Sequence, residues 1–500
     1  MADEGSGYER LGEKRLKLVD VVAQSVGFIG PVFSAAFLIP LIAGFSASGK
    51  GAGIASPFAV LLAAVGTFAL GWIVAQYAKR VHAAGSLYDY VSNGLGGRIG
   101  GVAGWLYYGG TTVLASAIAC LVGWYLHDVI FTADPAVPGV ISSTSPLPMW
   151  TWSLIFVAGV FLIQYLGVRL STRVQLTLAL VSAAVVLAFF VKVIVDVPVN
   201  SLKAFNPGEA PNLSSLLFGV LYGVLIFVGF ETAANLAEET ADPKRSIPRA
   251  VLLTVGIVTV FYLVAAYAQI AGFGFDLGTI TDPAVAAAPL FALGSPPAVG
   301  GYGSDAILKL LEVVVLLDVL AVGLGAAVAS TRGVFALARD RRIPGVLATV
   351  SSSRGTPIGA IMFVEAVSLV MVALSEFADT LFALTPRASH YFEMFVWLST
   401  FGGFALMVVY GSLAIGGFRG LRDHPNYVGV VIAGIIGLAI AVGAVFGGIY
   451  RQPNPANLVW RYVLAWTVLG IIVTALAKGR APASGVLSDL RSDQTQPAGG

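Results

Sequence analysis

Long apolar runs alternate with short polar segments along nearly the whole of this 500-residue chain. About 20 apolar residues in a helix cross a hydrocarbon layer roughly 30 Å thick. Twelve runs reach that length, and segments with Gly, Pro, Ser or charged residues separate them. The pattern predicts membrane spans at residues 20–44, 56–78, 100–130, 150–168, 173–196, 213–237, 248–275, 306–337, 357–376, 391–416, 428–449 and 458–477.

Composition strengthens this interpretation. Hydrophobic residues make up 57% of the chain and charged residues only 11%, whereas a soluble domain carries about 25% charged residues. The single Cys120 excludes an intrachain disulfide and a cysteine metal cluster. The sequence shows no His-x-x-Glu-His type pair and no Gly-x-Ser-x-Gly elbow. We therefore expect an all-α membrane protein with twelve transmembrane helices that is not an enzyme and uses no cofactor.

The lysines and arginines predict how the chain is oriented. Most of the 29 fall in alternate connecting segments, and these segments are cytoplasmic if the N-terminus is cytoplasmic. We expect a multi-pass protein of the cell membrane with both termini in the cytoplasm. Residues 1–18 form a polar N-terminal tail without the apolar run of a signal peptide, and residues 479–500 read as a disordered C-terminal tail.

The first span contains helix-breaking residues at its centre, namely Gly27, Gly30 and Pro31. Glycine weakens a helix by about 1 kcal/mol relative to alanine, and proline also removes a backbone donor. Backbone groups freed in hydrocarbon need protein, water or a ligand as partners. Two interpretations stay open: a discontinuous helix whose backbone binds an anion such as a carboxylate, or a kink at a close helix crossing.

The sixth span, "LIFVGFETAANLAEET", carries a polar stripe in its second half. A charged side chain near the bilayer centre costs at least about 2.5–3.5 kcal/mol, so it marks a pathway or a pairing site. Spacings of three and four place the stripe on one helix face. The stripe follows Gly229 and comprises Glu231, Asn235, Glu238 and Glu239. Two interpretations stay open: these side chains line a cytoplasmic aqueous pathway, or neighbouring helices satisfy them.

The sixth span is also interrupted, because Gly223 and Gly229 loosen its helix, and the two interrupted spans lie five spans apart. An odd separation inverts the topology of equivalent helices, and paired interruptions indicate an inverted-repeat transporter. We expect residues 19–417 to form a ten-helix transport core, a five-plus-five inverted repeat with discontinuous helices 1 and 6. Residues 418–478 would then hold two accessory helices, 11 and 12.

Four stretches resemble the amino acid–polyamine–organocation (APC) superfamily. The most specific is "GFETAANLAEETADPKRSIPRA" (229–250), similar to the sixth-span signature of that family. The others are "AAGSLYDYVSNGLGGRIGGVAGWLYY" (83–108), "STRVQ" (171–175) and "STRGVFALARDRRIP" (330–344). The resemblance covers spans 1 to 10 in order, and it implies an amino acid permease with its substrate at the midplane.

The resemblance also implies a substrate site. The backbone of the first interruption would hold the substrate carboxylate, and the backbone of the second would hold its amino group with Glu231 alongside. The family's usual Gly-Ser-Gly in span 1 is replaced here by "IGPVF". The implied binding residues are Gly27, Phe28, Ile29, Gly30, Tyr107, Phe227, Val228, Gly229, Phe230 and Glu231.

Coupling ions are predicted from two other spans. Ala327, Ser330 and Thr331 resemble the pattern with which sodium-coupled relatives of the fold supply a carbonyl and two hydroxyls. Proton-coupled members of the family can carry a lysine in the fifth span. That position falls near Ser182 in this chain, so the lysine is absent here. Sodium coupling, proton coupling, and exchange or uncoupled transport all stay open, with Asp318 and Glu312 as alternative proton carriers. No further metal ion is expected.

These observations predict a symporter or antiporter, a permease for amino acid transport. It would move an amino acid or related amine across the cell membrane by alternating access, coupled to Na⁺ or H⁺. A transporter of another organic cation or a nucleobase is the alternative, and so is a membrane sensor that does not transport. The expected partners are a small-molecule substrate and the lipid bilayer, with no nucleic acid.

Overall fold

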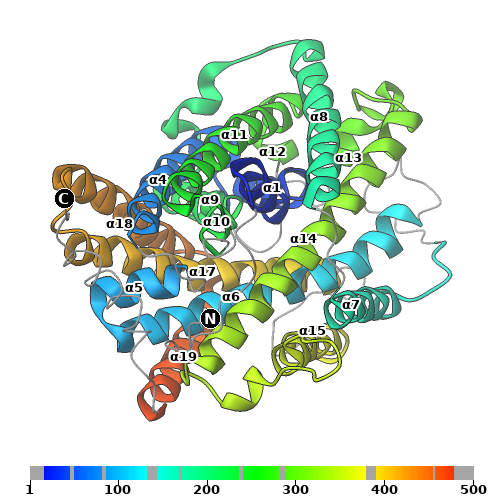
Figure 1. Cartoon of the computed structure of the whole chain (residues 1–500). Helices are drawn as coiled ribbons and strands as arrows, with labels where there is room; N and C mark the ends of the chain where they lie inside the picture. Colours follow the sequence, from blue (N-terminus) through cyan, green and yellow to red (C-terminus); the bar gives the residue numbers. More distant parts are fainter. Residues whose placement is uncertain are drawn as a thin grey trace.

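The computed structural model describes most of the chain as helices (Figure 1). The described residues are 16–44, 50–80, 86–131, 144–167, 172–235, 240–280, 289–378, 390–453 and 456–477, with the backbone alone given at 23–24, 172–178 and 235. Within these ranges there is no β-strand, and one isolated bridge pairs Leu16 with Thr240.

In the first half of the chain, the first transmembrane helix, called helix 1 below, consists of four pieces: α1 (Leu18–Ile29), α2 (Pro31–Phe33), π-helical η1 (Ser34–Leu38) and α3 (Ile39–Ala43). The elements that follow it in this half are η2 (Gly53–Ala55), α4 (Ser56–Ala78), α5 (Leu87–Leu95), α6 (Gly97–Trp124), π-helical η3 (Tyr125–Ile130), α7 (Met149–Leu166), α8 (Thr172–Asp196), η4 (Leu202–Phe205), η5 (Pro207–Glu209), α9 (Leu213–Leu225) and α10 (Thr232–Asn235).

The second half consists mainly of long helices. They are α11 (Pro243–Gly272), the short α12 (Leu277–Ile280), α13 (Pro289–Gly294) and η6 (Pro297–Val299), then α14 (Asp305–Arg339), η7 (Gly345–Ala348), α15 (Ile358–Phe377), α17 (His390–Gly420), α18 (Tyr427–Ile449) and α19 (Ala456–Leu476).

Ten of these helical stretches are long and apolar enough to cross a membrane, counted over the described residues. Each coincides with a predicted apolar run to within a few residues, which confirms the expected all-α, multi-pass class. Two more of the predicted runs also fall on helices. Residues 213–237 fall on the shorter apolar helix α9 and on α10, and residues 306–337 fall on α14, which is 35 residues long.

One predicted boundary is wrong. The apolar pattern starts a span at residue 248, yet α11 begins at Pro243 and contains Pro248. Proline is well suited to the first helical position, because its missing N–H has no helical partner there. Pro248 costs the helix one hydrogen bond near its start, and the helix continues through it.

Helix α1 lies in the middle of the molecule, between two groups of helices (Figure 1). It packs against α11 on one side and against α14 and α8 on the other, while α4 packs against both α9 and α11. In the second group α6 packs against α7, α14, α15 and α17. Helices α18 and α19 lie at the periphery; α18 contacts α4, α9 and α17, and α19 contacts α6, α17 and α18.

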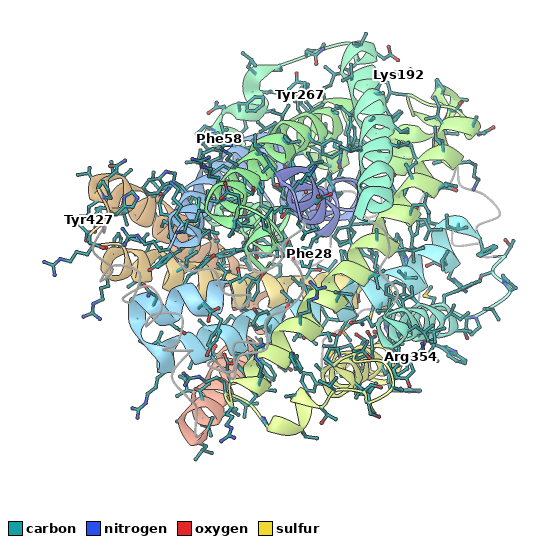
Figure 2. The ribbon with its side chains drawn as sticks, viewed as in Figure 1. Phe28, Phe58, Lys192, Tyr267, Arg354 and Tyr427 are labelled. Atoms are coloured by element: carbon teal, nitrogen blue, oxygen red, sulfur yellow. The ribbon has the colours of Figure 1, made fainter. Side chains whose placement is uncertain are left out.

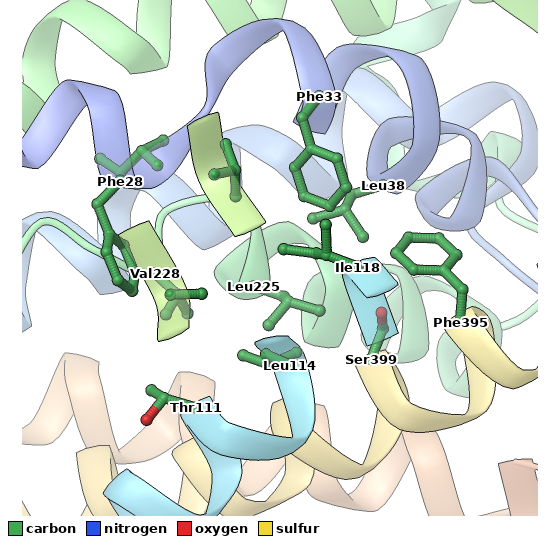
Figure 3. Close-up of a pocket in the computed structure, with 13 residues that line it drawn as sticks. Phe28, Phe33, Leu38, Thr111, Leu114, Ile118, Leu225, Val228, Phe395 and Ser399 are labelled. Carbon is green, nitrogen blue, oxygen red and sulfur yellow. The ribbon is translucent and has the colours of Figure 1, made fainter. Parts of the chain in front are cut away.

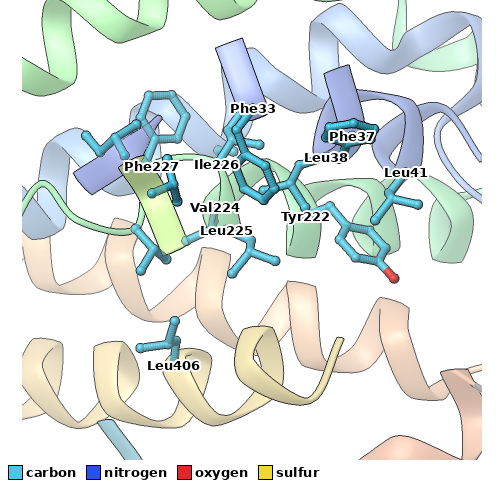
Figure 4. Close-up of a cluster of buried hydrophobic side chains, with 14 of the residues drawn as sticks. Phe33, Phe37, Leu38, Leu41, Tyr222, Val224, Leu225, Ile226, Phe227 and Leu406 are labelled. Atoms are coloured by element: carbon cyan, nitrogen blue, oxygen red, sulfur yellow. The ribbon is translucent and has the colours of Figure 1, made fainter. Parts of the chain in front are cut away.

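The second half of helix 1 packs against α9 in a dense apolar cluster (Figure 4). Phe37 is fully buried and contacts the rings of Tyr125 and Phe395 edge-on. The hydroxyl of Tyr222 in α9 is satisfied by Thr400 of α17 at 2.6 Å. Aromatic packing thus joins helix 1 to η3 and α17, and a hydrogen-bonded polar tip joins α9 to α17.

Candidate functional site

The first transmembrane helix is interrupted at Gly30. Helix α1 ends at Ile29, Gly30 adopts the left-handed conformation with φ 58°, and the chain turns helical again at Pro31. Pro31 has no N–H for the carbonyl of Gly27, four residues earlier, so that bond of a continuous helix cannot form. Segment Ser34–Leu38 is then π-helical, a distortion that is frequent at functional sites.

The sixth helix is interrupted at Gly229. Helix α9 ends at Leu225 and α10 begins at Thr232, and Gly229 between them has φ 118°. The Thr232 hydroxyl donates to the carbonyl of Gly229 at 2.6 Å, and the Tyr262 hydroxyl donates to that of Ile226 at 2.8 Å. Side chains thus satisfy carbonyls that a continuous helix would have satisfied itself.

The two interruptions lie against one another near the centre of the molecule, where Figure 2 labels Phe28. A Cβ atom at Gly229 would overlap the Phe28 ring and lie 3.1 Å from Cγ1 of Ile29. A Cβ atom at Gly30 would overlap Cγ2 of Val322 in α14. Two independent reasons therefore favour glycine at both positions: the positive φ and the lack of space for a Cβ atom.

A cavity of about 50 Å³ adjoins the interruptions (Figure 3). Helices 1, α6, α9, α14 and α17 and the sixth-helix interruption contribute to its wall. Among the described residues that line it, Thr111 and Ser399 are the only ones with a hydroxyl, and none carries a charge. The lining residues are Phe28, Ile29, Phe33, Leu38, Thr111, Leu114, Ile118, Leu225, Val228, Val322, Ala326, Phe395 and Ser399.

Glu231 lies outside this cavity wall and is completely buried. Its Oε1 accepts hydrogen bonds from the hydroxyls of Tyr107 at 2.9 Å and Tyr410 at 3.1 Å. Its Oε2 accepts one from the N–H of Gly229 at 3.1 Å. The carboxylate therefore joins α6 and α17 to the interruption of the sixth helix.

Asp318 of α14 is the second buried carboxylate at the interruptions, with 4% of its surface exposed. Its Oδ2 accepts a hydrogen bond of 2.7 Å from the N–H of Phe33, in the first turn after the Gly30 interruption. Neither Asp318 nor Glu231 forms an ion pair within the described part of the chain. Both carboxylates lack a protein cation there.

The predicted substrate residues separate into three groups. Phe28, Ile29 and Val228 line the cavity. Tyr107 and Glu231 lie bonded to each other outside it. The other predicted residues belong to the two interruptions or their flanks without lining the cavity; they are Gly27, Gly30, Phe227, Gly229 and Phe230.

Sequence reasoning missed part of the wall. Thr111 lies one helical turn after Tyr107, and that spacing could have indicated it. Phe395 and Ser399 carry no comparable signal, because nothing local distinguishes them from other α17 residues. Of the predicted cytoplasmic stripe, Asn235 ends α10, while Glu238 and Glu239 lie outside the described residues.

The predicted coupling residues are all buried. Ser182 in α8 is 3% exposed, and Ala327, Ser330 and Thr331 in α14 are at most 3% exposed. The hydroxyls of Ser330 and Thr331 have no hydrogen-bond partner among the described residues. Helix α14 packs against both α1 and α8, the helix that carries Ser182.

Comparison with known proteins identifies the family. The family model described as "Amino acid permease" matches residues 25–420, which contain both interruptions and the cavity. The chain belongs to the amino acid permease family. This permease is thus a multi-pass membrane transport protein of the APC superfamily, as its sequence stretches predict.

The relatives of this permease are transporters by name. The branched-chain amino acid permease BcaP of Bacillus subtilis is 25% identical over 66% of this chain and 70% of its own length. An uncharacterized transporter of Mycobacterium tuberculosis is 30% identical over 73% of this chain and 74% of its own. The methylthioribose transporter of Bacillus subtilis is 25% identical over 61% of this chain and 64% of its own.

Proposed function

We propose that this permease is a secondary active transporter that moves an amino acid or related amine across the cell membrane by alternating access. The observation that supports this proposal is the contact between two interrupted helices beside a cavity. Discontinuous helices at the midplane are the usual site of substrate and ion binding in inverted-repeat transporters.

The substrate would bind between the interruptions, against Gly27–Gly30 on one side and Phe227–Glu231 on the other. Helix α9 points its carbonyl end at the second interruption, and that end of a helix favours a positive charge. The apolar wall would hold the body of the substrate. Tyr107 would act through Glu231, because its hydroxyl donates to that carboxylate.

Helix α9 with α10, and α14, would be the two remaining spans of a twelve-helix topology. The distribution of Lys and Arg would then place both termini in the cytoplasm. On this topology Asn235, Glu238 and Glu239 would follow the substrate site on its cytoplasmic side. They would line the exit pathway.

Alternating access would occur between the two groups of helices. Helices α1, α4, α9 and α11 would rock against α6, α7, α14 and α15, with the cavity at their boundary. Rigid-body rocking of one bundle against another around a fixed site is the usual motion in such folds. The relatives' names include branched-chain amino acids and a sugar, methylthioribose, so family membership leaves the substrate class open.

Coupling to Na⁺ or H⁺ is part of the proposal. The unpartnered hydroxyls of Ser330 and Thr331 support Na⁺, because a small hard cation prefers oxygen ligands. Buried hydroxyls without partners also cost stability, which a bound cation would offset.

Uptake into proteoliposomes tests transport itself. Purified protein would be supplied with twenty amino acids and common polyamines, under a Na⁺ gradient, a pH gradient or neither. Saturable uptake of at least one compound is expected. Binding without any uptake would instead indicate a sensor and overturn the proposal.

The variant Ser330→Ala/Thr331→Ala tests the sodium site. We expect loss of the Na⁺-dependent component of uptake. Thr467→Ala in α19 is the control, since that hydroxyl bonds only its own helix, to the carbonyl of Val463 at 2.7 Å. Equal uptake by a pH gradient in sodium-free buffer would reject sodium coupling and favour protons.

A further inference from the structure

The carboxylate of Asp318 lies next to the cavity. Asp318 precedes Val322 by four residues in α14, so both side chains project from the same helix face. Val322 and Phe33 both line the cavity, and the N–H of Phe33 is the hydrogen-bond donor to Asp318. The carboxylate therefore adjoins the end of the cavity where helix 1 meets α14.

This carboxylate uses a backbone donor that a substrate carboxylate would need. The start of a helix attracts an anion through its free N–H groups and its dipole. After the interruption Pro31 has no N–H, and Phe33 donates its backbone N–H to Oδ2 of Asp318. The anion that these groups favour is already part of the protein.

The described part of the cavity wall offers no positively charged side chain. Its lining residues are apolar apart from two hydroxyls, and none of those described is Lys, Arg or His. A substrate carboxylate would meet Asp318 without a neutralising cation. An ammonium group would instead pair with a buried carboxylate that has no cationic partner within the described residues, and it would compensate a buried charge that is costly when left alone.

We propose that Asp318 binds the ammonium group of the substrate, and that this substrate is an organic amine with an apolar body and no free carboxylate. The rings of Phe28, Phe33 and Phe395 line the cavity and can contact the apolar body or the face of the cation. The inference rests on the proposed transport function and deepens it. It replaces the carboxylate site that family resemblance implies with a site for a cation.

Matched pairs of compounds test this inference on the purified full-length protein. Each pair joins an amino acid to the amine that lacks its carboxylate: leucine with 3-methylbutylamine, phenylalanine with phenethylamine, and lysine with cadaverine. Thermal unfolding at pH 7 would report binding, because a ligand of the folded state stabilises it. We expect the amine to bind about tenfold or more tightly than its amino acid in at least one pair.

The variant Asp318→Asn tests the residue. Asparagine keeps an oxygen that accepts from the N–H of Phe33 and removes only the charge. We expect affinity for the preferred amine to fall by about tenfold or more. Glu365→Gln is the control, because Glu365 is also a buried carboxylate, 5% exposed, and bonds Gln164 away from the cavity.

Three results would overturn the inference. Tighter binding of the amino acid in every pair that binds would show that the site accepts a carboxylate, and transport would still hold. Unchanged amine affinity in Asp318→Asn would remove the assigned role. An absence of both binding and uptake for all compounds would overturn the transport proposal, and the inference with it.

Discussion

Glu231 and Asp318 are both buried carboxylates beside an interrupted helix, yet their surroundings differ. Glu231 accepts hydrogen bonds from two tyrosine hydroxyls and one backbone N–H, and these come from α6, α17 and its own interruption. Asp318 accepts one hydrogen bond from the backbone N–H of Phe33 in helix 1, and it precedes the cavity-lining residue Val322 by one helical turn.

On our proposals, the difference separates a carboxylate that mainly positions the site from one that binds the ligand's charge. Three donors occupy Glu231, which joins three elements at the second interruption. Asp318 has one backbone donor and lies one turn from the cavity wall, so its charge would be available to a ligand. Burial and residue type alone do not distinguish Glu231 from Asp318, since both are buried carboxylates.

The largest effect is expected where the interruptions touch. Gly229→Ala should destabilise the fold by about 2–5 kcal/mol, because a left-handed strain of about 1–3 kcal/mol adds to overlap with Phe28. Thermal unfolding in detergent and monodispersity on size exclusion would measure it. Gly256→Ala is the control, since a Cβ there meets nothing within 4 Å, and it should be neutral or slightly stabilising.

An unchanged melting temperature in Gly229→Ala would contradict the close contact between the two interruptions. The contact between the interruptions would then not be what positions Glu231 and Asp318. Comparing Gly30→Ala extends the test to the Asp318 side, since a Cβ there would overlap Val322. We expect this variant to lower stability as well.

Glu231→Gln should have the next largest effect. A glutamine amide places an N–H group against one of three donors, which leaves a buried donor unsatisfied at a cost of about 1–3 kcal/mol. Transport should be impaired while expression persists. Tyr410→Phe removes one donor only and should cost about 1 kcal/mol. Normal stability and normal transport kinetics in Glu231→Gln would contradict the structural role that we assign to Glu231.

Asp318→Asn should change stability by less than about 1 kcal/mol, because the acceptor for the Phe33 N–H is kept. The contrast with Glu231→Gln is the informative quantity: one variant loses mainly stability and the other mainly affinity. Chemical or thermal unfolding of both variants without ligand would measure it. Equal destabilisation of the two would show that both carboxylates are structural.

The smallest effect is expected at an exposed carboxylate that does have a cation. Asp423 pairs with Arg80 at 2.6 Å and is 82% exposed, so Asp423→Asn should cost below about 1 kcal/mol. The hydrogen bond from Arg80 lowers the pKa of Asp423. The contribution is therefore present at neutral pH and is lost as the pH falls below about 4. Unfolding at pH 7 and pH 3, at low and high salt, would measure it.

Much of the fold could be predicted from the apolar runs, because hydrocarbon allows a backbone few alternatives to a continuous helix. The start of α11 was misplaced, since a proline within an apolar pattern does not say whether it starts a helix or lies inside its first turns. The interruptions at Gly30 and Gly229 fall where glycine and proline indicated them.

The site was predicted less completely. Phe28, Ile29 and Val228 belong to the cavity wall because they flank the predicted interruptions. Phe395 and Ser399 reach the same cavity from a helix more than 150 residues further along the chain, and no local pattern marks them. Of the two tyrosines that bond Glu231, Tyr107 was predicted as a substrate-site residue, although not as a partner of Glu231. Tyr410 was not predicted.

By itself the sequence determined a helical membrane protein with two weakened helices and a charged residue in the sixth, because burial in lipid and the chemistry of glycine and proline act locally along the chain; its resemblance to the APC superfamily added the permease. Only the tertiary structure decided which groups surround each charge. The role of a buried carboxylate depends on the donors that reach it, and for Asp318 the donor is the backbone of Phe33, 285 residues away.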